Sequence, residues 1–128
     1  MITYFEEISK ELSREETEII VPILVNGFKS HTKKDPVKAP DIVRKINLYL
    51  KKKEHKIKMT EVRLRKCCNY IRSNSLLPLI ATSGGYFVSY DKADIEAQII
   101  SLQERANSIN RCAAGLAAFF PHYSVNSD

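Results

Sequence analysis

The chain has 128 residues, about the length of one domain, and its content of 44% apolar and 27% charged residues is typical of a globular protein. Three cysteines are too few for a disulfide framework, and the longest apolar run, Ile19 to Val25, is too short to cross a bilayer. The first residues lack the basic and apolar regions of a secretory signal. We therefore expect a single domain over residues 1–128, in the reducing cytoplasm and away from membranes.

The positive charge is concentrated in the middle of the chain. Residues 29–73 contain fifteen basic and four acidic side chains and have a net charge of +11. Residues 1–28 have a net charge of −4, and residues 74–128 have one of −2. Such a block is typical of a surface that binds a polyanion, nucleic acid above all. A solvated lysine-rich face that only keeps the protein in solution is the alternative.

Residues 1–29 are predicted to form two acidic helices. Residues 2–12 carry apolar side chains at helical spacing. Ser13 and Glu16 form a capping box that opens the second helix, because each side chain accepts a hydrogen bond from the other residue's amide. Pro22 should kink this second helix or displace its start, since proline has no amide hydrogen and clashes with the preceding turn.

Two further helices are predicted after a polar loop that contains a short strand near Val37. The first begins at Pro40, a favoured first position in a helix, and ends in a lysine-rich run that suits the negative end of the helix dipole. After a tight connection, Thr60 caps the second helix, which covers residues 60–73. Its apolar arc consists of Leu64, Cys67, Cys68 and Ile71, and its polar arc contains Arg65, Lys66, Asn69 and Arg72.

A β-hairpin follows, because the β-prone runs 79–82 and 86–90 flank a Ser-Gly-Gly turn that tolerates positive φ angles. Two helices and then a hairpin is the order of a winged helix-turn-helix, which we predict for residues 38–90. In that module the second helix enters the major groove of duplex DNA, and the hairpin, or wing, lies along the neighbouring backbone. The expected fold class is therefore mainly α with a small β-hairpin.

The candidate DNA contacts follow from side-chain chemistry. Arginine suits guanine, asparagine suits adenine, and lysine suits phosphate. Tyr86 has two interpretations: its ring anchors the wing against the core, or its hydroxyl meets a phosphate. The candidates are Arg63, Arg65, Lys66, Asn69, Arg72, Lys53, Lys56, Lys58, Ser83, Gly84 and Tyr86.

Five segments together resemble the small winged-helix DNA-binding proteins of bacteria, their phages and their mobile elements. These segments are residues 60–66, 69–72, 76–81, 83–87 and 101–105. The family pattern is an Arg-x-x-Ile-x-x-Ile-Arg helix, a Leu-Ile-x-Ser-x-x-Gly-Tyr wing and a helix with Ser-Leu-x-x-Arg. The match covers residues 38–117, with Cys67 and Cys68 replacing an aliphatic pair and the acidic N-terminal helices outside it. The resemblance implies sequence-specific DNA binding, in transcription regulation or as an accessory protein of a mobile element, without catalytic residues.

The last predicted helix, over residues 91–121, carries an apolar seam with alternating steps of four and three residues, which is the spacing of a coiled coil. From Lys92 to Phe120 such a helix would be about 44 Å long, against roughly 30 Å for a small domain. We therefore expect a homodimer formed through this seam; the alternative is that part of it covers the chain's own core. The seam residues are Ile95, Ile99, Leu102, Ala106, Ile109, Ala113 and Leu116.

No motif in the sequence points to catalysis or to a bound cofactor. The cysteines and histidines lack zinc-ligand spacing, and the Ser-Gly-Gly turn lacks the pattern of a phosphate-binding loop. We expect neither an enzyme nor a metal or cofactor site. The leading hypothesis is a dimeric protein that binds double-stranded DNA. A winged-helix module for protein–protein interaction is the alternative, and RNA is the weaker third partner because no aromatic stacking platform is predicted.

Overall fold

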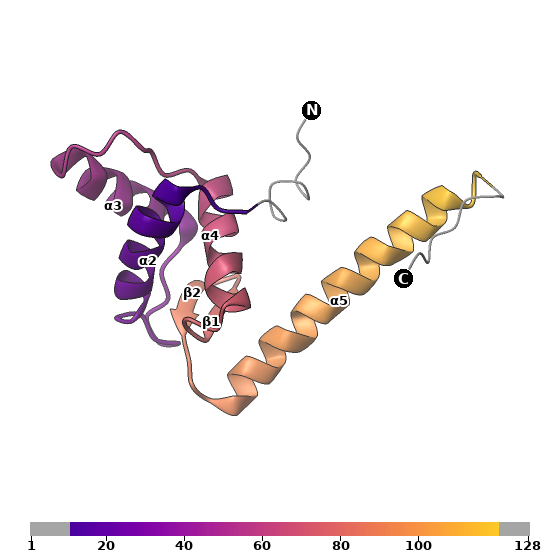
Figure 1. Cartoon of the computed structure of the whole chain (residues 1–128). Coiled ribbons are helices and arrows are strands. Elements are labelled where there is room, and N and C mark those ends of the chain that lie inside the picture. The colour runs from indigo at the N-terminus through magenta and orange to yellow at the C-terminus, as the bar shows by residue number, and fades with distance from the viewer. Residues whose placement is uncertain (1–10, 121–128) are drawn as a thin grey trace. The chain divides into compact units, whose positions relative to one another are not determined.

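The computed structural model describes residues 11–120, and it is mainly helical with one two-stranded antiparallel hairpin, as predicted (Figure 1). The predicted helix over residues 2–12 lies almost wholly outside the described residues. The elements are η1 (Glu16–Ile20), α2 (Val21–Phe28), α3 (Ala39–Lys52), α4 (Glu61–Ser73), β1 (Leu79–Thr82), β2 (Gly85–Val88) and α5 (Lys92–Ala117).

The chain separates into two compact units, one ending at Tyr90 and the other beginning at Asp91. The helix α5 therefore belongs to the second unit, whereas the sequence predicts one domain over the whole chain. None of the helices within residues 11–120 combines the length and the apolar character needed to span a membrane.

The capping box at the start of the second helix is confirmed. The Ser13 amide donates to Glu16 Oε1 at 2.8 Å, and the Glu16 amide donates to Ser13 Oγ at 3.1 Å. The predicted disturbance by Pro22 takes the form of a π-helical turn, η1, in which the Val21 amide donates to the Glu16 carbonyl five residues back. This wider turn accommodates the proline, which then lies in the first turn of α2.

One apolar core joins α2, α3, α4 and the hairpin. Ile20, Leu50, Leu64, Ile71 and Leu79 are among its most deeply buried side chains. The predicted apolar arc of α4 is confirmed, since all four of its residues are buried. Burial raises the pKa of both cysteine thiols in this arc to about 12, so they stay protonated and pack as small apolar groups.

The connection from α3 to α4 is longer than the tight turn predicted. It covers residues 53–60, where Ile57 and Met59 turn inward and are buried. The Asn47 side chain fixes this segment from α3, because its Nδ2 donates to the Met59 carbonyl at 3.0 Å and its Oδ1 accepts from the Met59 amide at 2.7 Å. The connection is therefore an anchored segment whose lysines face solvent.

The strand predicted near Val37 is present as a single bridge to the hairpin. The amides of Val37 and Tyr86 each donate to the other's carbonyl, at 2.9 and 2.8 Å. In the hairpin itself, Leu79 pairs with Val88 and Thr82 with Gly85. Gly85 has a φ of +127°, and a Cβ at this position would lie 2.6 Å from the Val37 carbonyl oxygen. Glycine is therefore required for this close approach.

The helix α5 begins at the cap predicted for it, where the Asp91 side chain accepts from the Ala93 amide at 3.1 Å. It ends at Ala117, short of the predicted end at residue 121. None of its residues is buried. Large apolar side chains of the predicted seam are exposed, among them Ile99, Ile109 and Leu116.

Candidate nucleic-acid interface

A buried carboxylate organises the first half of α4. Glu16 is 1% exposed, although it follows the capping serine in a strongly polar segment. Its Oε2 accepts from Arg63 Nε at 2.8 Å, and its Oε1 lies 2.9 Å from Lys66 Nζ. The Arg63 guanidinium also donates to the Lys58 carbonyl. This Glu16 cluster, formed by Glu16, Arg63 and Lys66, joins the N-terminal segment to α4.

The electrostatics of the Glu16 cluster favour a permanent charge on the carboxylate. Burial alone raises the pKa of Glu16, but hydrogen bonds from Lys66, from the Ser13 amide and from Arg63 outweigh it and lower the pKa to about 2. The two cations are in turn held by a group that is ionised at every physiological pH.

Three of the cations predicted to contact DNA from α4 have other partners. Arg63 and Lys66 belong to the Glu16 cluster, and the Lys66 side chain is only 18% exposed. Arg72 Nε donates to the Leu79 carbonyl at 3.1 Å, so this side chain braces the first strand of the hairpin. Each of these three side chains therefore has at least one partner within the fold, and its contact with DNA stays a prediction.

Arg65 and Asn69 are the remaining polar candidates on α4. They are four residues apart and therefore lie on the same side of the helix. Both are partly exposed, and Val62, one turn before them, is 37% exposed. Arg63, Lys66 and Arg72 are also partly exposed, so Arg65 and Asn69 are set apart by their shared side of the helix and not by greater exposure.

The lysine-rich connection differs from α4, because its cations are exposed. It leads from the end of α3 into the start of α4 (Figure 1). None of its lysines forms an ion pair with a carboxylate within residues 11–120. We call these lysines, together with the two that end α3, the connection lysines: Lys51, Lys52, Lys53, Lys56 and Lys58.

Three of the connection lysines, Lys51, Lys56 and Lys58, line a cleft of about 480 Å³. Its lining includes Lys51, Lys56 and Lys58 together with His55, and it contains no carboxylate. A concave surface with several cations and no acidic side chain concentrates positive potential, which suits the phosphates of a polyanion. Sequence reasoning did not predict the cleft, because it depends on the fold of residues 53–60.

The hairpin turn separates the remaining candidates into two groups. Ser83 and Gly84 are exposed at the turn. Tyr86 is partly buried, its ring centroid lies 5.7 Å from that of Phe28, and its hydroxyl is hydrogen-bonded with the Cys68 thiol. Burial raises the pKa of Tyr86 to about 12. This packing agrees with the interpretation that the Tyr86 ring anchors the wing. It does not agree with the alternative, in which the Tyr86 hydroxyl is free to contact a phosphate.

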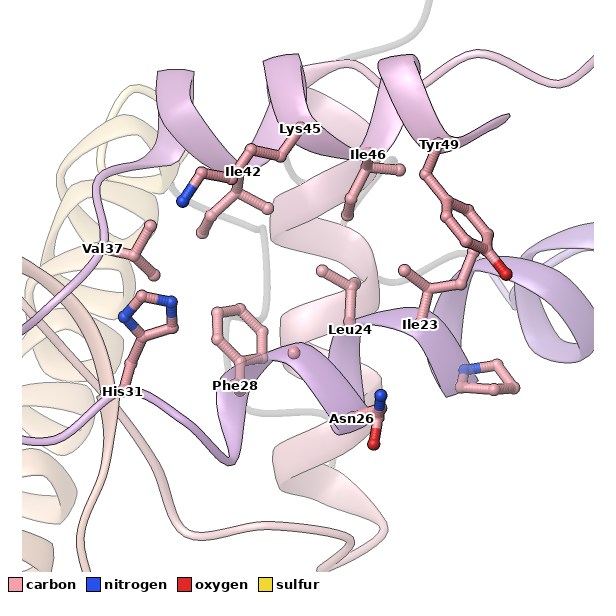
Figure 2. Close-up of a pocket in the computed structure, with 12 residues that line it drawn as sticks. Ile23, Leu24, Asn26, Phe28, His31, Val37, Ile42, Lys45, Ile46 and Tyr49 are labelled. Carbon is pink, nitrogen blue, oxygen red and sulfur yellow. The ribbon is translucent and has the colours of Figure 1, made fainter. Parts of the chain in front are cut away.

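A second, apolar pocket of about 490 Å³ lies between α2 and α3. Figure 2 shows Ile42 and Ile46 of α3 facing Leu24 and Phe28 of α2. On the same helix α3, the neighbouring side chains of Leu48 and Tyr49 are 62% and 45% exposed. This surface is distinct in chemistry from the lysine-lined cleft.

Comparisons with protein-family models, with curated proteins and with solved structures give no match. The resemblance to small winged-helix proteins therefore depends on the sequence motifs alone and stays a prediction. Within residues 11–120, no three histidine, cysteine, aspartate or glutamate side chains are grouped so that they could hold a metal ion.

Proposed function

We propose that the unit ending at Tyr90 is a winged helix-turn-helix that binds double-stranded DNA, and that the protein acts as a homodimeric transcriptional regulator or as an accessory protein of a mobile element. The order of elements supports this proposal: helix α2, the bridged strand at Val37, helices α3 and α4, and the hairpin. In this assignment α3 braces α4, and the hairpin is the wing.

The observation that carries the proposal is the cleft lined by Lys51, Lys56 and Lys58, none of which forms an ion pair with a carboxylate among the described residues. Phosphate contacts supply most of the affinity of a protein for duplex DNA, because each neutralised phosphate releases condensed counterions. A surface for this purpose needs exposed cations without competing carboxylates. The lining of the cleft meets this requirement, because the one carboxylate of the connection, Glu54, is exposed and does not line the cleft. The segment is anchored by Ile57, Met59 and the Asn47 side chain.

Base recognition is assigned to Arg65 and Asn69. Arginine forms a two-pronged contact with guanine, and asparagine forms one with adenine. The exposed turn at Ser83 and Gly84 suits a contact with the backbone. The Glu16 cluster and Arg72 hold α4 and the wing in position, so their role is in the geometry of the interface.

The proposal is tested by measuring the affinity for a labelled duplex at increasing salt. For the wild type we expect binding at low salt and a steep loss with rising salt. The double variant Lys56→Ala/Lys58→Ala should make the dependence of log K on log salt less steep by about 1.8, or about 0.9 for each lost phosphate contact. The matched control Lys29→Ala/Lys92→Ala removes two exposed charges outside the proposed DNA contacts and should leave the steepness unchanged. Failure of the folded wild type to bind duplex at low salt would overturn the proposal.

A protein-interaction module is the second candidate, and the apolar pocket between α2 and α3 favours it. The exposed Leu48 and Tyr49 side chains extend this apolar character over the surface of α3. For this function, Tyr49→Ala would weaken binding of a protein partner, and Lys56→Ala/Lys58→Ala would have no effect on duplex affinity because there would be none to lose.

A further inference from the structure

We infer that two copies of this chain pair through α5 in antiparallel orientation. The inference rests on the proposed homodimer and specifies its geometry. The need for a partner follows from exposure: none of the 26 residues of α5 is buried, and Ile99, Ile109 and Leu116 are 46%, 44% and 69% exposed. These three side chains lie on the seam with its steps of four and three residues, so one partner helix could cover them together.

The sizes of the seam residues favour the antiparallel orientation. In a parallel pair each seam residue meets its own copy, so Ala106 would face Ala106 and Ala113 would face Ala113, between layers of paired isoleucines and leucines. Such alternation leaves voids beside the alanines, and voids are costly in a core packed to the usual density. Parallel dimers also favour β-branched residues at the positions that these alanines occupy.

An antiparallel pair can match every small seam residue with a large one. In the register that we infer, Leu102 of one copy meets Ala113 of the other, and Ala106 meets Ile109. Ile99 then meets Leu116, and the symmetry repeats each layer once. This register covers all three of the exposed large seam residues, and large and small side chains interdigitate across the four central layers.

The charge distribution along α5 is complementary in the same orientation. Residues 92–104 contain one lysine and three carboxylates, a net charge of −2. Residues 105–117 contain two arginines and no carboxylate, a net charge of +2. Antiparallel pairing places the acidic half beside the basic half of the other copy, whereas parallel pairing places like charges together. Charge therefore sets the orientation and adds little to the affinity.

This geometry has a consequence for the proposed DNA site. In the inferred register the two Lys92 positions are about 46 Å apart along the pair, at 1.5 Å per residue. The units that end at Tyr90 are thus attached to opposite ends of the helix pair. We expect two half-sites that are separated by at least one turn of the duplex, about 34–36 Å between centres.

The test uses spin labels at two positions that are equivalent in the heptad, Ala97→Cys and Glu104→Cys, each in a Cys112→Ser background that removes the exposed native thiol. In the inferred register the labels of two copies are offset along the axis by about 32 Å at position 97 and about 11 Å at position 104. Distances between labels should therefore differ clearly between the two variants. A parallel pair gives equal distances at both positions, a result that would overturn the inference.

Two controls make the result independent of DNA binding. The distances are measured without DNA, so a protein that fails to bind duplex still reports the orientation of its pair. Adding Leu102→Asp to each labelled variant should abolish the coupling between labels and give a monomer in light scattering. Circular dichroism should still show a helical chain, because the unit ending at Tyr90 does not depend on the pairing of α5. A monomeric, folded wild type contradicts the inference and leaves the seam to cover the chain's own surface.

Discussion

Arg63 and Lys66 of the Glu16 cluster follow the connection lysines closely in sequence, but the two groups of cations lie in different surroundings. In the cluster, Arg63 and Lys66 are held by one buried carboxylate from the N-terminal segment. In the connection, Lys53, Lys56 and Lys58 face solvent without a carboxylate partner among the described residues. A block of basic residues in a sequence can therefore indicate a binding surface only after the members that pair within the fold are left out.

The cause of the difference is burial of the acidic partner. A carboxylate removed from water needs compensating donors, and Glu16 obtains them from two side chains of α4 and from the Ser13 amide. The connection has no such acidic side chain turned inward, since its buried residues are apolar. Its cations are therefore left exposed to solvent.

The largest expected effect is on stability, when the carboxylate of the cluster is removed. Glu16→Ala leaves Arg63 and Lys66 without their acceptor, and we expect a loss of about 3 kcal/mol in the free energy of unfolding, within the range for broken buried ion pairs. Urea denaturation measures it. The matched control Glu18→Ala removes an exposed carboxylate that pairs with Arg14 and should cost less than about 1 kcal/mol. Equal losses in the two variants would contradict the role given to Glu16.

The second effect is the pH dependence of the same cluster. The pKa of Glu16 is lowered from 4.5 to about 2 in the folded state. The stabilisation is thus fully present above pH 4.5 and is lost as the pH falls toward 2, with a total of about 3 kcal/mol. Unfolding free energies measured from pH 6 to pH 2 should show this decline, and Glu16→Gln should reduce it by the contribution of one carboxyl. An unaltered pH profile in this variant would show that Glu16 does not titrate as described.

A third prediction separates base contact from structural support within α4. Arg65→Ala should relax base preference at one position of the bound sequence, at a cost of about 1–3 kcal/mol in affinity for the preferred duplex. Arg63→Ala should lower stability and leave the preferred sequence unchanged. Selection of bound duplexes from a random pool measures both variants. A changed preference in Arg63→Ala alone would reverse the two assignments.

The smallest expected effect is on stability at the connection. Lys53→Ala and Lys58→Ala should each change the free energy of unfolding by no more than about 0.5 kcal/mol, as surface substitutions do. The same denaturation experiments test this expectation. A loss comparable with that of Glu16→Ala would mean that these lysines support the fold, and the contrast between the two regions would disappear.

Local patterns explain why much of the fold could be predicted. The capping box at Ser13, the buried arc of α4 and the cap at Thr60 all depend on residues a few positions apart, and the structure confirms each of them. The strand near Val37 is also confirmed. The winged-helix assignment and DNA binding remain predictions, because neither follows from contacts between residues that are close in sequence.

The cluster could not be predicted in the same way, since Glu16 and Arg63 are 47 positions apart and the capping box already accounts for Glu16 within its own helix. The connection carried a usable signal. Ile57 and Met59 alternate with Lys58, which is the pattern of an extended segment with every second side chain buried. That alternation predicts an anchored segment with outward lysines in place of a tight turn.

The most direct test of the account is an NMR titration of the isotope-labelled protein with a short duplex, following backbone amides and the side chains of lysine and arginine. The largest chemical-shift changes should occur in residues 51–60 and at Arg65 and Asn69. The guanidinium signal of Arg63 should stay unchanged, because this side chain remains bound to Glu16. Changes confined to residues 11–28 or to α5, with the connection unaffected, would contradict it.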